Sequence, residues 1–119
     1  MASVLSTSGK TVSLTALAGV AVFGSLHSGD PGATGTLLEL TGGSPPYARK
    51  ALTWGTAAAG SVAVAAVLPT RDVPAGSTVS YVGLWSLVTG GVYYGCFDIT
   101  DEVFAGQGTY NLTAGSITL

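Results

Sequence analysis

Charged side chains are scarce in this sequence. Only 8% of its 119 residues are Asp, Glu, Lys or Arg, and the net charge at pH 7 is -2, whereas roughly 25% of an ordinary soluble domain is charged. Glycine, serine, threonine and alanine replace the missing charges, while the hydrophobic share of 47% is ordinary. A surface with few ions is desolvated at low cost when another protein covers it. We therefore expect much of the exterior to lie against neighbouring subunits.

The small number of cations and cysteines excludes two further classes. Among the four Lys and Arg residues only Arg49 and Lys50 are adjacent, so no basic stripe exists that would capture nucleic acid. The single cysteine, Cys96, excludes an internal disulfide, and we expect it to be a small buried hydrophobe rather than a nucleophile. The sequence thus predicts no nucleic-acid partner.

Catalytic motifs are missing as well. No Gly-x-Ser-x-Gly elbow is present, and the spacing of glycines 29, 32 and 35 matches neither a dinucleotide fingerprint nor a P-loop. His27 is the only histidine, so no second imidazole is available for a metal site. Asp30-Pro31-Gly32 fits a type II turn. We interpret Ser25–Gly35 as a connection between strands, and we expect no cofactor and no enzymatic activity.

Acidic residues gather only once, at Asp98, Asp101 and Glu102. This cluster lacks the ligand spacing and central glycine of a calcium loop, and it does not supply the paired carboxylates in a cleft that a depolymerase needs. We expect a solvated turn after a strand. Binding of a host glycan by this cluster and the tyrosines stays open as an alternative.

The longest apolar run, residues 11–26, superficially resembles the core of an export signal. Lys10 precedes it, but threonine and serine interrupt it, and it is shorter than the roughly 20 apolar residues that cross a bilayer. We therefore expect neither a cleaved signal nor contact with a membrane.

Alternating segments separated by glycine and proline predict an all-β fold. Residues 1–10 are expected to form an N-terminal arm and residues 11–119 a single domain, in which Thr11–Ala18 fits a short helix ended by Gly19. The spacing favours a β-sandwich or jelly roll of antiparallel strands. The eight expected strands are Val20–His27, Thr36–Leu40, Tyr47–Trp54, Ser61–Leu68, Thr78–Leu87, Val92–Thr100, Thr109–Thr113 and Ser116–Leu119. The last two are expected to pair with each other, and Pro69–Gly76 is expected to form a turn.

The large aromatic residues fall on these strands and suggest both a core and an interface. Trp54 and Trp85 are predicted core residues, because each large ring buries much apolar area. Tyr and Arg sharing a strand face are typical anchors of protein interfaces. The predicted interface residues are Tyr47, Arg49, Ala51 and Tyr93.

Four segments carry a resemblance to a known family. They read SLHSGDPGATG (Ser25–Gly35), GGSPPYARKALTWG (Gly42–Gly55), PAGSTVSYVGLWS (Pro74–Ser86) and GTYNLTAGSITL (Gly108–Leu119). Together they resemble small structural proteins of tailed bacteriophages, especially those of actinobacteria, over residues 20–119. The departures are small, with Ser28 where threonine is usual and Pro46 in place of a small residue.

Members of that family are described as minor tail, tail-fibre, minor capsid or decoration proteins. The resemblance therefore implies a structural component of the virion, assembled in the host cytoplasm. A short single domain without repeats or a coiled coil favours a decoration protein that docks on the major capsid protein as a symmetric oligomer, expected to be a homotrimer. The alternative is a minor tail, tail-tip or fibre protein, with a role in binding a host glycan.

Overall fold

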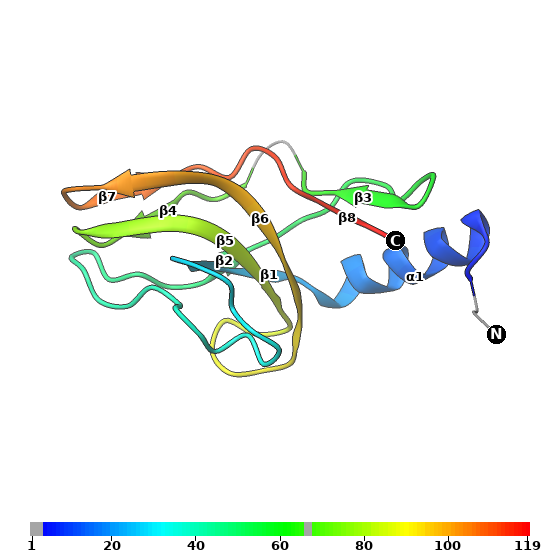
Figure 1. Cartoon of the computed structure of the whole chain (residues 1–119), viewed down its shortest axis with the longest axis horizontal. Coiled ribbons are helices and arrows are strands. Elements are labelled where there is room, and N and C mark those ends of the chain that lie inside the picture. Colours follow the sequence, from blue (N-terminus) through cyan, green and yellow to red (C-terminus); the bar gives the residue numbers. More distant parts are fainter. Residues whose placement is uncertain (1–3, 66–67) are drawn as a thin grey trace.

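A four-stranded antiparallel sheet forms the main layer of the molecule (Figure 1). The structure, a computed structural model, describes residues 4–65 and 68–119. The strand order in this sheet is β2-β1-β5-β6. Its strands are β1 (Phe23–His27), β2 (Lys50–Ala51), β5 (Ser77–Trp85) and β6 (Tyr93–Phe104).

Two small sheets form the layer that faces it. Strand β3 (Ser61–Ala63) pairs with β8 (Ser116–Thr118), and β4 (Arg71–Val73) pairs with β7 (Gly108–Tyr110), all antiparallel. The main core combines Leu26, Val82 and Phe97 of the large sheet with Val73 and Tyr110 of the facing layer. The predicted all-β class is therefore confirmed, with the core between the two layers.

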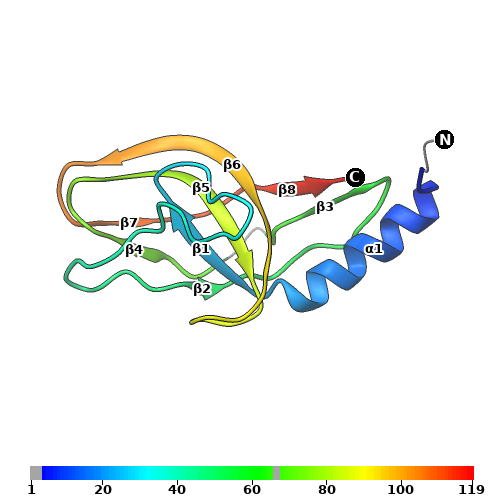
Figure 2. The same ribbon diagram turned by 60° about the horizontal axis from the view of Figure 1, so that its bottom comes forward.

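One helix, α1 (Thr7–Val20), extends from the end of the sandwich where the C-terminus also lies (Figure 2). Its start is fixed by Ser6, whose hydroxyl accepts a hydrogen bond from the backbone N–H of Gly9 at 3.1 Å. Leu14 is its one fully buried residue and packs against Ala57 and Val62.

The helix corrects two boundaries predicted from the sequence. Residues 7–10, expected in the arm, are helical, because the hydroxyl cap at Ser6 precedes them. Gly19 does not end the helix, which continues to Val20 before the backbone turns at Ala21. Residues 1–3 of the predicted arm lie outside the described residues.

Most predicted strands are present, but several are shorter and pair differently. Tyr47–Trp54 contributes only β2 and an isolated bridge, and Thr36–Leu40 only a bridge between His27 and Glu39, since Leu38 adopts a positive φ of 60° that breaks the strand. Of Ser61–Leu68, residues 61–63 form β3, while residues 66 and 67 lie outside the described part.

The pairing expected at the C-terminal end is wrong. The strands predicted as Thr109–Thr113 and Ser116–Leu119 do not pair with each other, because β7 pairs with β4 and β8 pairs with β3. Strand β4 occupies the segment predicted as a turn. Both partners are distant in the sequence, so local turn chemistry does not reveal them.

Arg71 on β4 connects the two layers at the β2 edge. Its side chain is fully buried, and its guanidinium donates to the carbonyl oxygens of Pro69 at 3.1 Å and of Lys50 and Ala51 at 3.4 Å. Burial lowers the pKa of Arg71, because desolvation disfavours the charged form. Its Nε has no hydrogen-bond partner in the described part of the chain. The sheet edge at β2 is thus covered by a buried cation rather than by another strand.

Replacing Arg71 with Met should lower the free energy of unfolding by about 2–4 kcal/mol, because three carbonyl oxygens lose their buried donor. The measurement is urea unfolding, with Lys50→Met as the matched removal of a neighbouring cation. Lys50 donates no side-chain hydrogen bond in the described structure, and its replacement should cost about 0.5 kcal/mol or less. Equal stability of the two variants would contradict the role given to Arg71.

Candidate functional site

The polar residues of this chain gather on the face of the large sheet that points away from the core. Ser25 and His27 alternate along β1 toward this face, and the cross-strand partner of Ser25 is Gly83 on β5. Trp85, two residues beyond Gly83, lies on the same face. Ser25 and His27 are fully buried, because the loops after β1 and β5 cover them.

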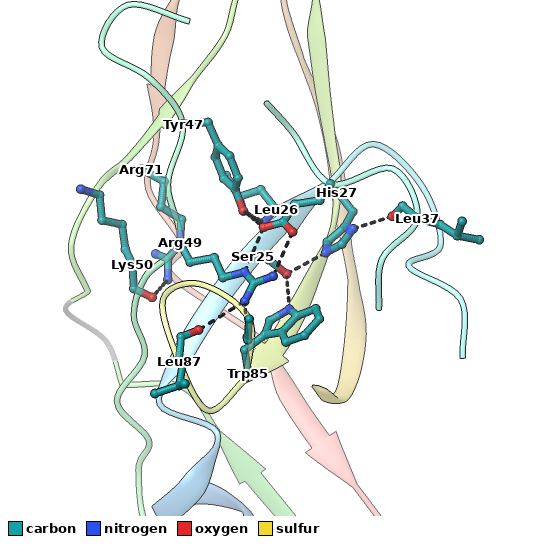
Figure 3. Close-up of polar contacts among 12 residues, drawn as sticks. Ser25, Leu26, His27, Leu37, Tyr47, Arg49, Lys50, Arg71, Trp85 and Leu87 are labelled. Carbon is teal, nitrogen blue, oxygen red and sulfur yellow. Dashed lines mark hydrogen bonds and ion pairs between the residues drawn. The ribbon is translucent and has the colours of Figure 1, made fainter. Parts of the chain in front are cut away.

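A continuous chain of hydrogen bonds joins these side chains (Figure 3). Trp85 Nε1 donates to the Ser25 hydroxyl at 3.0 Å, and Ser25 Oγ lies 2.7 Å from His27 Nε2. His27 Nδ1 lies 2.7 Å from the carbonyl oxygen of Leu37, which only accepts, so Nδ1 carries the proton. Ser25 therefore donates to an unprotonated Nε2, and every member is satisfied when His27 is neutral.

The charge state of His27 follows from this geometry. Burial lowers the pKa of His27, against the opposing effects of the Leu37 carbonyl and the Glu39 carboxylate. A second ring proton would face the Ser25 oxygen, which already accepts from Trp85. The imidazole therefore acts as a neutral connector between β1 and the segment at Leu37.

The close approach of the three side chains requires glycine at position 83. A Cβ atom there would lie 2.3 Å from Ser25 Oγ, 3.0 Å from His27 Nε2 and 3.1 Å from Trp85 Nε1. The space above Gly83 is filled by the hydrogen-bonded side chains. The glycine is thus a packing requirement of the network.

An ion pair extends the network over the Trp85 ring. Arg49 donates from Nε to Glu39 Oε2 at 3.0 Å and from its terminal nitrogen to Oε1 at 3.1 Å, a two-point contact. The Arg49 guanidinium carbon lies 3.8 Å from the Trp85 ring centroid, within cation–π range. Tyr47 donates its hydroxyl proton to Glu39 at 2.7 Å and accepts from the backbone N–H of Leu26 at 2.9 Å.

The other terminal nitrogen of Arg49 fixes the loop between β5 and β6. It donates to the carbonyl oxygens of Leu87 at 3.3 Å and Gly90 at 2.9 Å. Four of the five N–H groups that a guanidinium carries are therefore used. Burial alone would raise the pKa of Glu39, but the hydrogen bonds from Arg49 and Tyr47 outweigh it and hold that pKa below its usual value.

A shallow hollow of about 340 Å³ opens beside the ion pair, between the segment at Glu39–Gly42 and the loop at Val88–Gly90. Its charged side chains are already paired with each other, and the Ser25 and His27 side chains beneath are fully buried. A serine–histidine pair acts as a nucleophile only when substrate can reach the hydroxyl. Because both side chains are covered, the cluster holds loops on the sheet.

The structure brings most of the sequence-predicted residues into this one cluster. Tyr47 and Arg49 turn inward onto Glu39, and Tyr93 packs against Trp85 with ring centroids 5.1 Å apart. Trp85 is 5% exposed, whereas Trp54 is partly buried between the main core and the Leu14 cluster and donates to the Ala21 carbonyl at 2.8 Å.

Ala51 is exposed on β2. Tyr47 and Arg49 use their hydrogen-bonding groups within the chain. The interface expected at Tyr47, Arg49, Ala51 and Tyr93 stays a prediction.

Sequence reasoning missed Ser25, His27 and Glu39. The signal was the alternation itself, because Ser25 and His27 are two positions apart and therefore share one face of a strand. Glu39 follows Leu38, whose positive φ interrupts the extended backbone, so the position of Glu39 opposite His27 depends on the loop conformation. At the predicted turn Asp30-Pro31-Gly32, the Asp30 carboxylate accepts from the Gly32 N–H at 2.8 Å and Gly32 has a φ of 76°, while the backbone hydrogen bond of the turn joins Gly35 to Gly32.

Asp98, Asp101 and Glu102 lie on β6 rather than in the turn that was expected, and all three are exposed. Across residues 4–65 and 68–119, no three His, Cys, Asp or Glu side chains come close enough to share a metal ion. Over the same residues, no helix has the length and apolar character needed to cross a membrane.

Comparison with known proteins gives one match. Residues 3–119 match the model of a family described as "Podophage GP4 fiber I protein gp80". No curated protein and no solved structure matches the chain.

A methyl group at position 83 should break the buried network. Gly83→Ala is expected to reduce the free energy of unfolding by about 1–3 kcal/mol, because Ser25 Oγ must move from its place between Trp85 and His27. Gly106→Ala is the matched control, since nothing lies within 4 Å of the added carbon. Denaturant unfolding of both variants checks this, and a Gly83→Ala protein as stable as the control would refute the packing argument.

Stability should also fall below neutral pH because of His27. The folded-state pKa lies below 6.5, so the unfolded chain binds a proton that the folded chain excludes, and stability is lost as the pH falls below 6.5. Glu39 acts in a lower window, because its depressed pKa adds stability that is lost only below about 4.5. Unfolding free energies measured from about pH 7.5 to about pH 5 should slope in the native protein and be flat in His27→Gln. An unchanged slope in that variant would contradict the neutral imidazole.

Proposed function

Because the chain belongs to the gp80 family of podophage fibre proteins, we propose that it is a structural subunit of the virion that assembles with copies of itself. The family match supports the fibre alternative among the roles predicted from the sequence. It gives no support to a capsid decoration protein in particular. A subunit of this kind needs a surface that is easily desolvated, and the helix α1 provides one.

Few interactions within the chain stabilise the helix α1. Nine of its 14 residues are Gly, Ser, Thr or Val, it has no acidic residue in the first turn and no basic residue in the last, and only Leu14 is buried. Short helices are marginal in water even with better helix formers, and most helical stability in proteins comes from packing. A neighbouring copy that covers the outer face would supply the missing packing.

The exposed side of α1 carries a stripe of apolar side chains and no charge. Positions 12, 16 and 20 of the helix, with Leu5 just before the Ser6 cap, recur at helical spacing opposite Leu14. Of these, Leu5 is 53% exposed, Val12 70% and Val20 42%. Lys10 is the single charged residue of the helix. Covering this stripe removes apolar area from water without desolvating an ion.

Three of the five hydroxyl groups of the helix donate within it. Thr11, Ser13 and Thr15 donate to the carbonyl oxygens of Thr7, Gly9 and Thr11, four residues earlier, at 2.8–3.0 Å. Such bonds weaken an isolated helix slightly, but they leave few donors that lose water when a partner covers the surface. This arrangement is the observation that carries the proposal.

A charge at the centre of the stripe should separate the subunits. Val12→Glu is expected to weaken self-association by at least about tenfold, because a neighbouring copy brings a like charge opposite. Sedimentation equilibrium over a range of concentrations is the measurement, with near-ultraviolet circular dichroism to confirm that the sandwich is folded.

Ala51→Glu is the matched variant, because it places the same charge on the strand face predicted from the sequence. We expect it to leave the oligomer intact. Dissociation by Ala51→Glu with none by Val12→Glu would refute assembly through the helix, as would a native protein that stays monomeric at all concentrations.

A further inference from the structure

The large sheet has one open edge, and it is unusually long. Strand β6 has 12 residues, whereas strands of about five or six are common, and its only strand partner in the described structure is β5. Its pairing with β5 shifts register between Asp98 and Glu102 and again between Tyr93 and Gly95. The opposite edge, at β2, is covered by the buried Arg71 guanidinium. An open edge presents backbone N–H and C=O groups in the pattern that another extended chain can pair with.

A groove of about 340 Å³ runs beside the middle of this strand. It lies between β6 and the segment that joins β7 to β8, and it is lined by Ile99, Thr100, Tyr110, Thr113, Ala114 and Gly115. The lining is small or aromatic and carries no charge. Alternate side chains of an added strand would point toward this groove, as in known cases of strand addition.

The charges along the β6 edge favour a positively charged partner. Asp98 precedes Ile99, while Asp101 and Glu102 follow Thr100, so acidic side chains flank the groove residues on both sides and all three are exposed. Asp98 is the largest cause that raises the pKa of the nearby Tyr81, which indicates a negative potential at this face. Within the described residues the cations lie elsewhere, with Arg49 and Arg71 in internal contacts, Lys10 on α1 and Lys50 on β2.

A second copy of this strand is therefore a poor partner. Two antiparallel β6 strands centred on the groove would bring the acidic groups of one copy against those of the other, and such like-charge pairing is unfavourable. A partner strand that carries lysine or arginine can pair with the open backbone groups of β6 and is attracted by the negative potential of its acidic side chains.

We propose that the open edge of β6 binds an extended, basic segment of a different protein, which adds to the sheet as a fifth strand beside the groove. Backbone hydrogen bonds hold the segment, small apolar side chains enter the groove, and lysine or arginine side chains contact Asp98 and Glu102. The inference rests on the fold and its charges and does not depend on self-association through α1.

The experiment uses blocked synthetic peptides and the full chain labelled with ¹⁵N. The basic probe is Lys-Val-Thr-Val-Lys, in which both valines share one face of a strand and both lysines the other. It is compared with the same peptide carrying glutamate in place of lysine and with a version in which the threonine is proline. We expect saturable binding of the basic peptide, with amide shifts confined to residues 97–103 and 110–115. Binding should be at least about tenfold weaker for the glutamate peptide and lost for the proline peptide, which cannot pair along a strand.

Two variants test the assignment on the protein side. Asp98→Asn combined with Glu102→Gln should weaken binding of the basic peptide roughly fivefold or more. Asp72→Asn removes a carboxylate on β4, in the other layer, and should leave binding unchanged. Ala114→Phe fills the groove and should abolish binding whatever the peptide's charge.

Three results would overturn the proposal. They are equal affinity for the basic and acidic peptides, shifts outside β6 and the groove, and no saturable binding of any peptide. Aggregation of the Asp98→Asn, Glu102→Gln protein in the last case would mean that the acidic groups only protect the edge from self-pairing. Repeating the titration with Val12→Glu separates peptide binding at β6 from self-association through α1, because that variant alters assembly but should bind the peptide normally.

Discussion

The two-point ion pair between Glu39 and Arg49, stacked on Trp85, is the interaction on which the rest of this structure depends. It joins the segment after β1 to the loop after β5, and beneath it the bonds from Trp85 through Ser25 to His27 hold the same segment from inside. A buried network of this kind is favourable only when every member is satisfied. Gly83, the neutral imidazole and the Leu37 carbonyl all meet that requirement.

The placement of the charged residues shows how the few that are present are used. Two of the four cations, Arg49 and Arg71, serve internal contacts, and one of the six acids, Glu39, pairs with Arg49. Three of the five remaining acids lie on β6, whereas α1 carries a single charge. The exterior is therefore divided into an apolar helix face and an acidic strand edge. Surfaces that differ in this way suit different partners.

The sequence predicted the class of the fold better than its pairing. Alternation located β1, β5 and β6, and glycines 90 and 91 marked the connection between the last two. Pairing of β3 with β8 and of β4 with β7 joins residues at least 35 positions apart in the chain (Val73 and Gly108 are the nearest pair), beyond the reach of local turn chemistry. The polar cluster was only partly predictable for a similar reason. Tyr47 and Arg49 were recognised as anchors, but the position of their partner Glu39 is set by the conformation of a loop.

Assembly through α1 is the central claim, and amide hydrogen exchange of that helix as a function of protein concentration tests it most directly. A helix stabilised by a neighbouring copy should exchange slowly in concentrated solution and much faster on dilution, while the amides of β1 and β5 keep the same protection. Protection of α1 that does not change with concentration would contradict the account, because the helix would then be stable without a partner.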